Sequence, residues 1–291
     1  MKLASRGSDL ALWQARRVAD GLAGDADIVT VETEADRFEG DVADLGHQGV
    51  FVRELDLRVA DGDVDGAVHS MKDMPTERPE GVEVAAVLER GPAYDALVSL
   101  DGHTIDDLPE GAVVGTSSAR RKAQVERYRD DVEIEGLRGN VDTRVERLRD
   151  GDYDAVVLSS AGLDRLDIDV PREELPPSDF VPAANQGVVA VVAREDTDAF
   201  ERLRRLDHKR TRVEATAERT VLSRVGGGCI APMGVYAVIR GEYIEISAEV
   251  VSSEGDVSFQ RRYPVHLYVE GAREIADDMV DEGARALMEE S

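Results

Sequence analysis

The chain has 291 residues, enough for two or three domains that each bury a core. Its 61 acidic residues outnumber 35 basic ones and give a formal net charge of -26, which argues against nucleic acid or membranes as partners because both need a basic face. A single cysteine excludes an intrachain disulfide framework and a CxxC metal site.

The first residues of the chain and the choice between lysine and arginine both indicate where in the cell the protein functions. Residues 1–6 lack the apolar run of a signal peptide, and the longest clean apolar run, 188–193, is far too short to span a bilayer. Lysine occurs only at Lys2, Lys72, Lys122 and Lys209. An acidic, lysine-poor surface is typical of a high-salt cytoplasm, where ions screen self-repulsion. We therefore expect a cytoplasmic, halophilic protein.

Short apolar segments rich in valine alternate with helix-period segments up to about residue 206. The predicted strands are 28–33, 66–69, 82–87, 96–100, 112–115, 155–158 and 188–192. The predicted helices are 8–22, 51–61, 118–128, 141–149 and 199–206. This alternation predicts an α/β fold with mostly parallel sheets, whose ligand sites lie beyond the carboxyl ends of the strands.

The last third of the chain has a different pattern. Residues 243–250 alternate as a half-buried strand does, and 259–268 could pair with them after a turn at 253–256. Pro264 favours an edge strand. An amphipathic helix over 272–288 completes a separate α+β domain, which the chain enters through three glycines after Val225.

Arginine is concentrated between Gly115 and Arg149, where nine basic residues face seven acidic ones in an otherwise acidic chain. Within this segment a strand runs into a helix start that carries Arg120 and Arg121. Backbone N–H groups and the helix dipole favour an anion there and disfavour cations, so a bound carboxylate or phosphate would remove the conflict. The alternative interpretation is a few surface salt bridges.

A second polar cluster follows the predicted strand 66–69. Pro75 stops a regular continuation, so Lys72 and Asp73 are expected at the carboxyl end of that strand. A carboxylate beside cations can stay ionised, or act as a general acid if it is desolvated. An exposed Lys-Asp turn without function explains the same residues equally well.

The lone Cys229 follows three glycines and precedes Ile230-Ala231-Pro232, which places it on a loop. A lone cysteine is most often a small buried hydrophobe, but a reactive or modified thiol is an equal alternative here. The five histidines show no metal-ligand spacing, and no metal site is expected.

Seven segments in chain order resemble the porphobilinogen deaminase (hydroxymethylbilane synthase) family. They are ASRGSDLALWQA (4–15), GVFVREL (49–55), HSMKDMP (69–75), GTSSARR (115–121), LRGNVDTR (137–144), AGLDR (161–165) and GGCIAPMG (227–234). The resemblance implies two type II periplasmic-binding-protein-like α/β domains and a C-terminal α+β domain. The domain boundaries that we predict are 1–90 with 187–207, 91–186, and 208–291.

The resemblance also implies a chemistry. Enzymes of this family carry a dipyrromethane cofactor on the cysteine that matches Cys229. They join four porphobilinogen molecules head to tail, release ammonia at each addition and hydrolyse off the linear hydroxymethylbilane. Because each pyrrole unit carries an acetate and a propionate, an arginine-rich site on an acidic protein suits this substrate. Asp73 matches the catalytic aspartate, which protonates the leaving amine and stabilises the resulting cation.

The remaining site residues follow from the same match. Cofactor-binding residues would be Ser70, Lys72, Thr116, Ser117, Ser118, Arg120, Arg121, Gly139 and Gln186, with Cys229 as the covalent attachment. Substrate-binding residues would be Arg6, Ser8, Phe51, Arg138, Arg144 and Arg165. We expect a monomer with porphobilinogen as its small-molecule substrate.

The sequence departs from the family pattern in several loops. Asp44 and Gln48 stand where lysines are usual, Ala35 and Asn185 replace glycines, and Tyr94 replaces an arginine before Asp95. These changes leave two alternatives open: a non-catalytic anion-binding module of the same fold, and a degenerate homologue that takes up cofactor but turns over poorly.

Overall fold

The structure is a computed structural model that describes residues 1–32, 50–227 and 231–289. The chain divides into two compact units. Unit 1 contains Met1–Gly91 and Val188–Val213, and unit 2 contains Pro92–Gly187 and Glu214–Ser291. The predictions for Ala35, Asp44, Gln48 and Cys229 concern residues outside the described ranges, and the side chain of Phe51 is also outside them.

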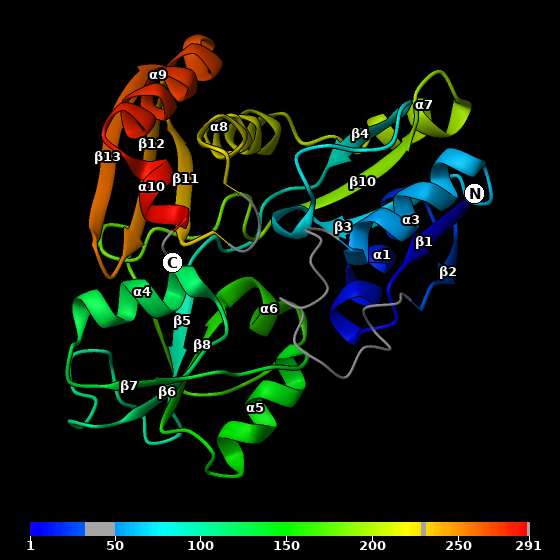
Figure 1. Cartoon of the computed structure of the whole chain (residues 1–291). Helices are drawn as coiled ribbons and strands as arrows, with labels where there is room; N and C mark the ends of the chain where they lie inside the picture. Colours follow the sequence, from blue (N-terminus) through cyan, green and yellow to red (C-terminus); the bar gives the residue numbers. More distant parts are fainter. Residues whose placement is uncertain (33–49, 228–230, 290–291) are drawn as a thin grey trace. The chain divides into compact units, whose positions relative to one another are not determined.

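Unit 1 is built on a five-stranded sheet of order β2-β1-β3-β10-β4 (Figure 1). Its strands are β1 (Lys2–Ser5), β2 (Asp27–Thr30), β3 (Gly66–Ser70), β4 (Val82–Val87) and β10 (Val189–Arg194). β1 is parallel to both of its neighbours, whereas β10 is antiparallel to β3 and β4. The parallel strands β1 and β3 therefore end at one edge of the sheet.

Helices cover both faces of this sheet. Helices α1 (Asp9–Gly21) and α7 (Asp198–Arg204) pack on the face that carries Leu3 and Val68. The opposite face carries His69, whose ring contacts α3 (Val50–Asp61). Because successive side chains of a strand alternate between faces, one apolar run supplies both layers.

The first sheet of unit 2 repeats the arrangement, in the order β7-β6-β8-β5-β9. Its strands are β5 (Asp95–Val98), β6 (Val113–Gly115), β7 (Glu133–Glu135), β8 (Ala155–Ser159) and β9 (Arg172–Glu174). β6 is parallel to β7 and β8, and β5 is antiparallel to β8 and β9. In each sheet the antiparallel strand is the one that begins just after the chain crosses between units.

Two separate apolar clusters cover the faces of this second sheet. Leu97 and Val157 pack with Val125 of α4 (Ala119–Tyr128). Their strand neighbours pack on the other side with helices α5 (Val141–Arg149) and α6 (Ser160–Arg165). The alternation of β5 and β8 thus anchors α4 on one face and α5 and α6 on the other.

Helix α8 (Lys209–Val225) leads the chain from unit 1 into the rest of unit 2. An antiparallel sheet of order β11-β12-β13 follows it. The strands are β11 (Met233–Arg240), β12 (Tyr243–Ser252) and β13 (Gly255–Pro264). A short 3-10 helix η3 (Val265–Leu267), α9 (Tyr268–Asp281) and α10 (Ala284–Glu289) follow. The predicted α/β fold with a C-terminal α+β part is confirmed, but the prediction of mostly parallel sheets was wrong, because one antiparallel strand pairs with two neighbours in each five-stranded sheet.

Several boundaries were wrong. No local pattern predicts β1, β7, β9, β11, α6 or α8, because these elements are short, strongly charged or without clear periodicity. The strand expected over 259–268 begins at Gly255 and ends at Pro264. It lies at the edge of its sheet, as Pro264 predicted. The single helix expected over 272–288 is two helices, separated at Gly283, whose φ of 93° favours glycine.

Candidate active site

The carboxyl ends of β1 and β3 place the first group of predicted site residues in unit 1. Arg6 follows β1, and Ser8 caps α1, its Oγ accepting a hydrogen bond from the Ala11 N–H at 3.4 Å. The segment from Ser70 to Asp73 follows β3. Since β1 and β3 are neighbouring parallel strands, these residues gather at one edge of the sheet.

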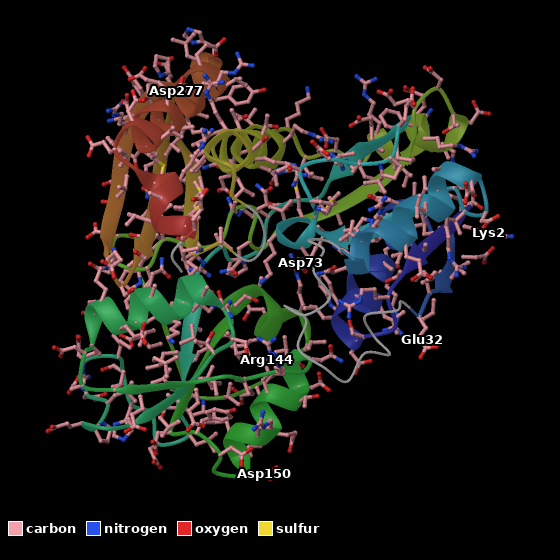
Figure 2. The ribbon with its side chains drawn as sticks, viewed as in Figure 1. Lys2, Glu32, Asp73, Arg144, Asp150 and Asp277 are labelled. Carbon is pink, nitrogen blue, oxygen red and sulfur yellow. The ribbon has the colours of Figure 1, made fainter. Side chains whose placement is uncertain are left out.

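The turn that carries Asp73 is held by buried methionines. It forms a 3-10 helix η2 (Met71–Asp73) directly after β3, in which Met71 is 4% and Met74 is 2% exposed. The Met71 N–H donates to the Val188 carbonyl at 2.9 Å. Lys72 is half-buried and Asp73 is exposed (Figure 2). Buried methionine side chains therefore anchor the turn, while Lys72 is partly accessible to solvent and Asp73 is exposed.

A buried pair supports the same strand end. His69 Nε2 lies 2.8 Å from Asp56 Oδ1 of α3, and the two side chains are 4% and 1% exposed. This contact ties the last residues of β3 to the helix that covers that face of the sheet. The histidine expected to have no metal role thus has a structural partner.

The second group of predicted site residues lies at an edge of the first sheet of unit 2. The parallel strands β6, β7 and β8 end there, and the antiparallel β5 begins there, with Asp95 opposite Ser159. After β6, Thr116 Oγ1 accepts a hydrogen bond from the Ser118 N–H at 3.2 Å, and Ser118 caps α4 by accepting from the Arg121 N–H at 3.4 Å. The helix start predicted at residue 118 is correct.

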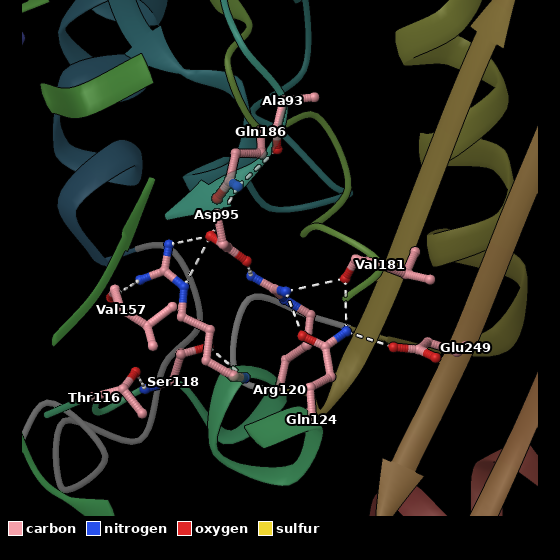
Figure 3. Close-up of polar contacts among 11 residues, drawn as sticks. Ala93, Asp95, Thr116, Ser118, Arg120, Gln124, Val157, Val181, Gln186 and Glu249 are labelled. Carbon is pink, nitrogen blue, oxygen red and sulfur yellow. Dashed lines mark hydrogen bonds and ion pairs between the residues drawn. The ribbon is translucent and has the colours of Figure 1, made fainter. Parts of the chain in front are cut away.

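Asp95 organises this edge (Figure 3). Its carboxylate is 1% exposed and accepts from Arg120 Nη2 at 2.7 Å, and from Arg121 Nη2 and Nε at 2.6 and 3.0 Å. Gln186 Nε2 donates to the same carboxylate at 2.9 Å. The two arginines are 4% and 7% exposed, so this is a buried network and not the surface salt bridges of the alternative interpretation.

The charges in this network stabilise one another. Burial alone would raise the pKa of Asp95, but the adjacent guanidinium groups of Arg120 and Arg121 outweigh it and hold that pKa well below its usual range. Burial likewise lowers the pKa of Arg120, and the nearby carboxylate of Asp95 opposes the shift. Asp95 therefore supplies one anion to the first turn of α4.

The turn before Gln186 explains one departure from the family pattern. Asn185 has a φ of 62°, a left-handed conformation that glycine adopts freely and asparagine tolerates. Its Nδ2 donates to the Ala215 carbonyl at 3.0 Å and to Glu218 at 3.2 Å, both on α8. Asn185 thus adopts the left-handed backbone conformation that a glycine would adopt, and its side chain adds hydrogen bonds to α8.

Tyr94 accounts for a second departure. Its ring meets that of Tyr236 on β11 edge to face, with the ring centroids 6.2 Å apart. The carbonyl of the preceding residue, Ala93, accepts from Gln186 Nε2 at 2.8 Å. An aromatic contact with the C-terminal sheet therefore occupies the position where the family usually has an arginine.

The other predicted arginines lie near the same edge of unit 2. Arg138 and Gly139 follow β7 and are exposed, and the φ of 104° at Gly139 favours glycine. Arg144 Nε donates to the Gly139 carbonyl at 2.8 Å (Figure 2). Arg165 Nη2 donates to the Gly187 carbonyl at 2.6 Å, and burial lowers the pKa of Arg165 to about 10. Ser117 is exposed in the loop before α4.

The sequence reasoning missed three members of the buried network: Asp95, Gln124 and Glu249. Asp95 starts a strand that is otherwise apolar, and such an isolated acid in a buried strand is a usable signal. Gln124 and Glu249 are 125 residues apart, and no local pattern connects them.

Two searches of the described residues complete the description. Across residues 1–32, 50–227 and 231–289, no group of three or more His, Cys, Asp or Glu side chains is arranged to hold a metal ion. In the same part of the chain, no helix is both long enough and apolar enough to cross a bilayer.

Comparison with known proteins identifies relatives of the whole chain. Residues 1–202 match the family model "Porphobilinogen deaminase, dipyromethane cofactor binding domain", and residues 212–282 match "Porphobilinogen deaminase, C-terminal domain". A probable porphobilinogen deaminase of Methanosarcina acetivorans is 44% identical over 100% of this chain and 95% of its own length. One from Halobacterium salinarum is 38% identical, covering 100% of this chain and 98% of its own.

Among solved structures, a double mutant of the BvgS VFT2 domain from Bordetella pertussis is similar over 71% of this chain and 85% of its own. The TM-score is 0.41 and the identity 14%. Likeness at this level says nothing about a ligand.

Proposed function

Because the chain belongs to the porphobilinogen deaminase family, we propose that it joins four porphobilinogen molecules head to tail into hydroxymethylbilane. One ammonia leaves at each addition. The chain is thus a transferase of tetrapyrrole, or porphyrin, biosynthesis. The match of both family models along the chain carries this conclusion.

The catalytic step that we propose is centred on Asp73. Its exposed carboxylate projects from a turn that Met71 and Met74 anchor, next to Lys72. A proton from this carboxyl group to the amino group of porphobilinogen would allow ammonia to leave. The resulting carboxylate would then stabilise the cation left on the substrate.

The arginines of unit 2 fit a cofactor with several carboxylates. Arg138 is exposed, and Arg165 is a half-buried cation whose desolvation a bound carboxylate would offset. When bound, the dipyrromethane supplies the pyrrole carbon that begins the chain. The proposed cofactor-binding residues are Cys229, Ser70, Lys72, Thr116, Ser117, Ser118, Arg120, Arg121, Gly139 and Gln186. The proposed substrate-binding residues are Arg6, Ser8, Phe51, Arg138, Arg144 and Arg165.

We also propose three domains, 1–90 with 187–207, 91–186, and 208–291, in a cytoplasmic monomer that functions at high salt. The separate family models for residues 1–202 and 212–282 support an independent C-terminal domain. The net charge of -26 supports the salt dependence, because counter-ions reduce the repulsion among carboxylates.

The experiment that tests the function is the intact mass of the purified protein beside a Cys229→Ser control. We expect a covalent increment of two porphobilinogen units less two ammonia, present in the wild type and absent in the control. A protein that stays unmodified after incubation with porphobilinogen and preuroporphyrinogen would instead be an anion-binding module. A modified protein without turnover would be a degenerate deaminase.

A further inference from the structure

Glu249 is a buried acid outside every motif that the proposed function uses. Its side chain on β12 is nearly inaccessible, with 3% exposure. Its carboxylate accepts a hydrogen bond from Gln124 Nε2 and forms an ion pair with Arg127 Nη1 at 3.1 Å. A buried polar group needs such partners to offset the loss of water, and both of them lie on α4.

Gln124 connects Glu249 to the arginine cluster. Its Nε2 also donates to the Val181 carbonyl at 2.8 Å, and its Oε1 accepts from Arg120 Nη1 at 2.8 Å. The Glu249 carboxylate and the Val181 carbonyl both accept from Nε2, so together they hold the amide with its NH2 group toward β12 and its oxygen toward Arg120. The hydrogen bonds therefore run in one direction from Arg120 to Gln124 and on to Glu249 (Figure 3).

The strand beside Glu249 leads to the cysteine segment. Gly234 of β11 is opposite Glu249 in the register, and in the sequence it lies a few residues after Cys229. A Cβ on Gly234 would lie 2.3 Å from the Val181 carbonyl oxygen, so this approach requires glycine. The same oxygen accepts from Arg120 Nη1 at 3.0 Å. α4 and β11 thus meet at one backbone carbonyl.

We propose that Glu249 is a positioning residue, which holds Arg120 of α4 in register with β11, the strand that follows Cys229 in the sequence. This inference rests on the proposed function, in which Cys229 carries the dipyrromethane and Arg120 binds one of its carboxylates. Without the charge at position 249, the Gln124 NH2 group keeps the Val181 carbonyl as an acceptor but loses its charged acceptor on β12. The amide that accepts from Arg120 is then held less firmly, and Arg120 would shift.

The test compares Glu249→Gln with Glu245→Gln. Glu245 lies on the same strand and pairs with Arg240 Nε at 2.9 Å, with no part in the α4 network. At a temperature where all proteins are folded, we expect Glu249→Gln to lower kcat about tenfold, with KM for porphobilinogen within about twofold of wild type. Conversion of the apo-protein to the loaded form, followed by intact mass, should slow by a similar factor. Glu245→Gln should change neither.

A second variant guards against misfolding of the first. Arg127 is 33% exposed, so Arg127→Gln removes the ion pair with little risk to the fold and should lower kcat about threefold. Wild-type kcat and loading in both folded variants would overturn the inference. An activity loss that only follows the folded fraction would also overturn it, because a purely structural role predicts that result. Failure of the wild type and Glu245→Gln to load cofactor would overturn the proposed function, and the inference with it.

Discussion

The two five-stranded sheets have the same strand order but use the edge at which their parallel strands end in different ways. In unit 1 the edge presents an exposed Asp73 on a turn anchored by buried methionines. In unit 2 the edge is occupied by a buried network around Asp95, which engages two arginines and a glutamine. The same sheet topology thus presents an accessible acid in unit 1 and a buried set of paired cations in unit 2.

This difference shows that the presence of an acidic residue beside basic residues does not by itself identify a reactive group. Both edges carry an aspartate next to basic residues in the sequence or in space. Asp95 is surrounded by permanent donors and is held ionised, whereas Asp73 is exposed to solvent. A proton donor must be accessible, so the two carboxylates should respond to the same substitution in opposite ways.

The largest expected effect tests the exposed edge. Asp73→Asn should lower kcat about a thousandfold without changing the free energy of unfolding, because the amide cannot deliver a proton and the side chain is exposed. Steady-state kinetics with porphobilinogen and denaturant unfolding measure the two quantities. Glu77→Gln, an exposed acid in the same segment, is the control and should retain activity. Near-wild-type activity of Asp73→Asn would refute the assignment.

The corresponding substitution in unit 2, Asp95→Asn, tests the buried network. Asp95→Asn would leave two buried guanidinium groups without their carboxylate, and we expect a loss of about 3–5 kcal/mol in the free energy of unfolding. Denaturant unfolding measures it. The exposed Asp101→Asn, just beyond the same strand, should stay within about 0.5 kcal/mol of wild type. Equal stabilities would mean that the network contributes little.

The pH dependence sharpens this contrast. Because the pKa of Asp95 is lower in the folded than in the unfolded protein, its stabilisation is fully present above the unfolded value of about 4 and is lost as pH falls below it. The stability difference between wild type and Asp95→Asn should therefore be constant from pH 7 to about 5 and shrink toward pH 2.5. Unfolding at high salt across this range measures the difference. A gap that widens on acidification would contradict the sign.

A smaller effect is expected for an exposed arginine of unit 2. Arg138→Leu should raise KM for porphobilinogen about tenfold with little change in kcat, because it removes a carboxylate contact common to the ground and transition states. Arg149→Leu, which removes an exposed pair with Glu146, is the matched control. Unchanged KM in Arg138→Leu would remove this residue from the substrate site.

The last substitution tests the turn next to the buried network. Asn185→Ala should destabilise by about 2 kcal/mol, because alanine is strained at a φ of 62° and loses the amide contacts to α8. Asn185→Gly keeps the backbone conformation and should lose only about 1 kcal/mol. Denaturant unfolding distinguishes the two variants. An alanine variant more stable than the glycine variant would show that the left-handed conformation is not required.

Much of the fold could be predicted because it depends on local patterns. The apolar segments around Ala67, Val84, Val156 and Val191 indicated strands, and Ser118 marked a helix start by its capping chemistry. Elements such as β7 (Glu133–Glu135) could not be predicted, since two of its three residues are charged and exposed, and pairing with β6 alone makes it a strand. Their strand character comes from a neighbour, not from their own residues.

The sequence by itself determined the family, the α/β class, and the residue types at each candidate position, because motif order and periodicity are properties of the chain. Only the tertiary structure decided which charges are paired. It brings Asp95 to Arg120 and Arg121, and Glu249 to Gln124, across long separations in the chain. The energy of a charge depends on its burial and its partners in space, so these pairings follow from packing and not from local sequence.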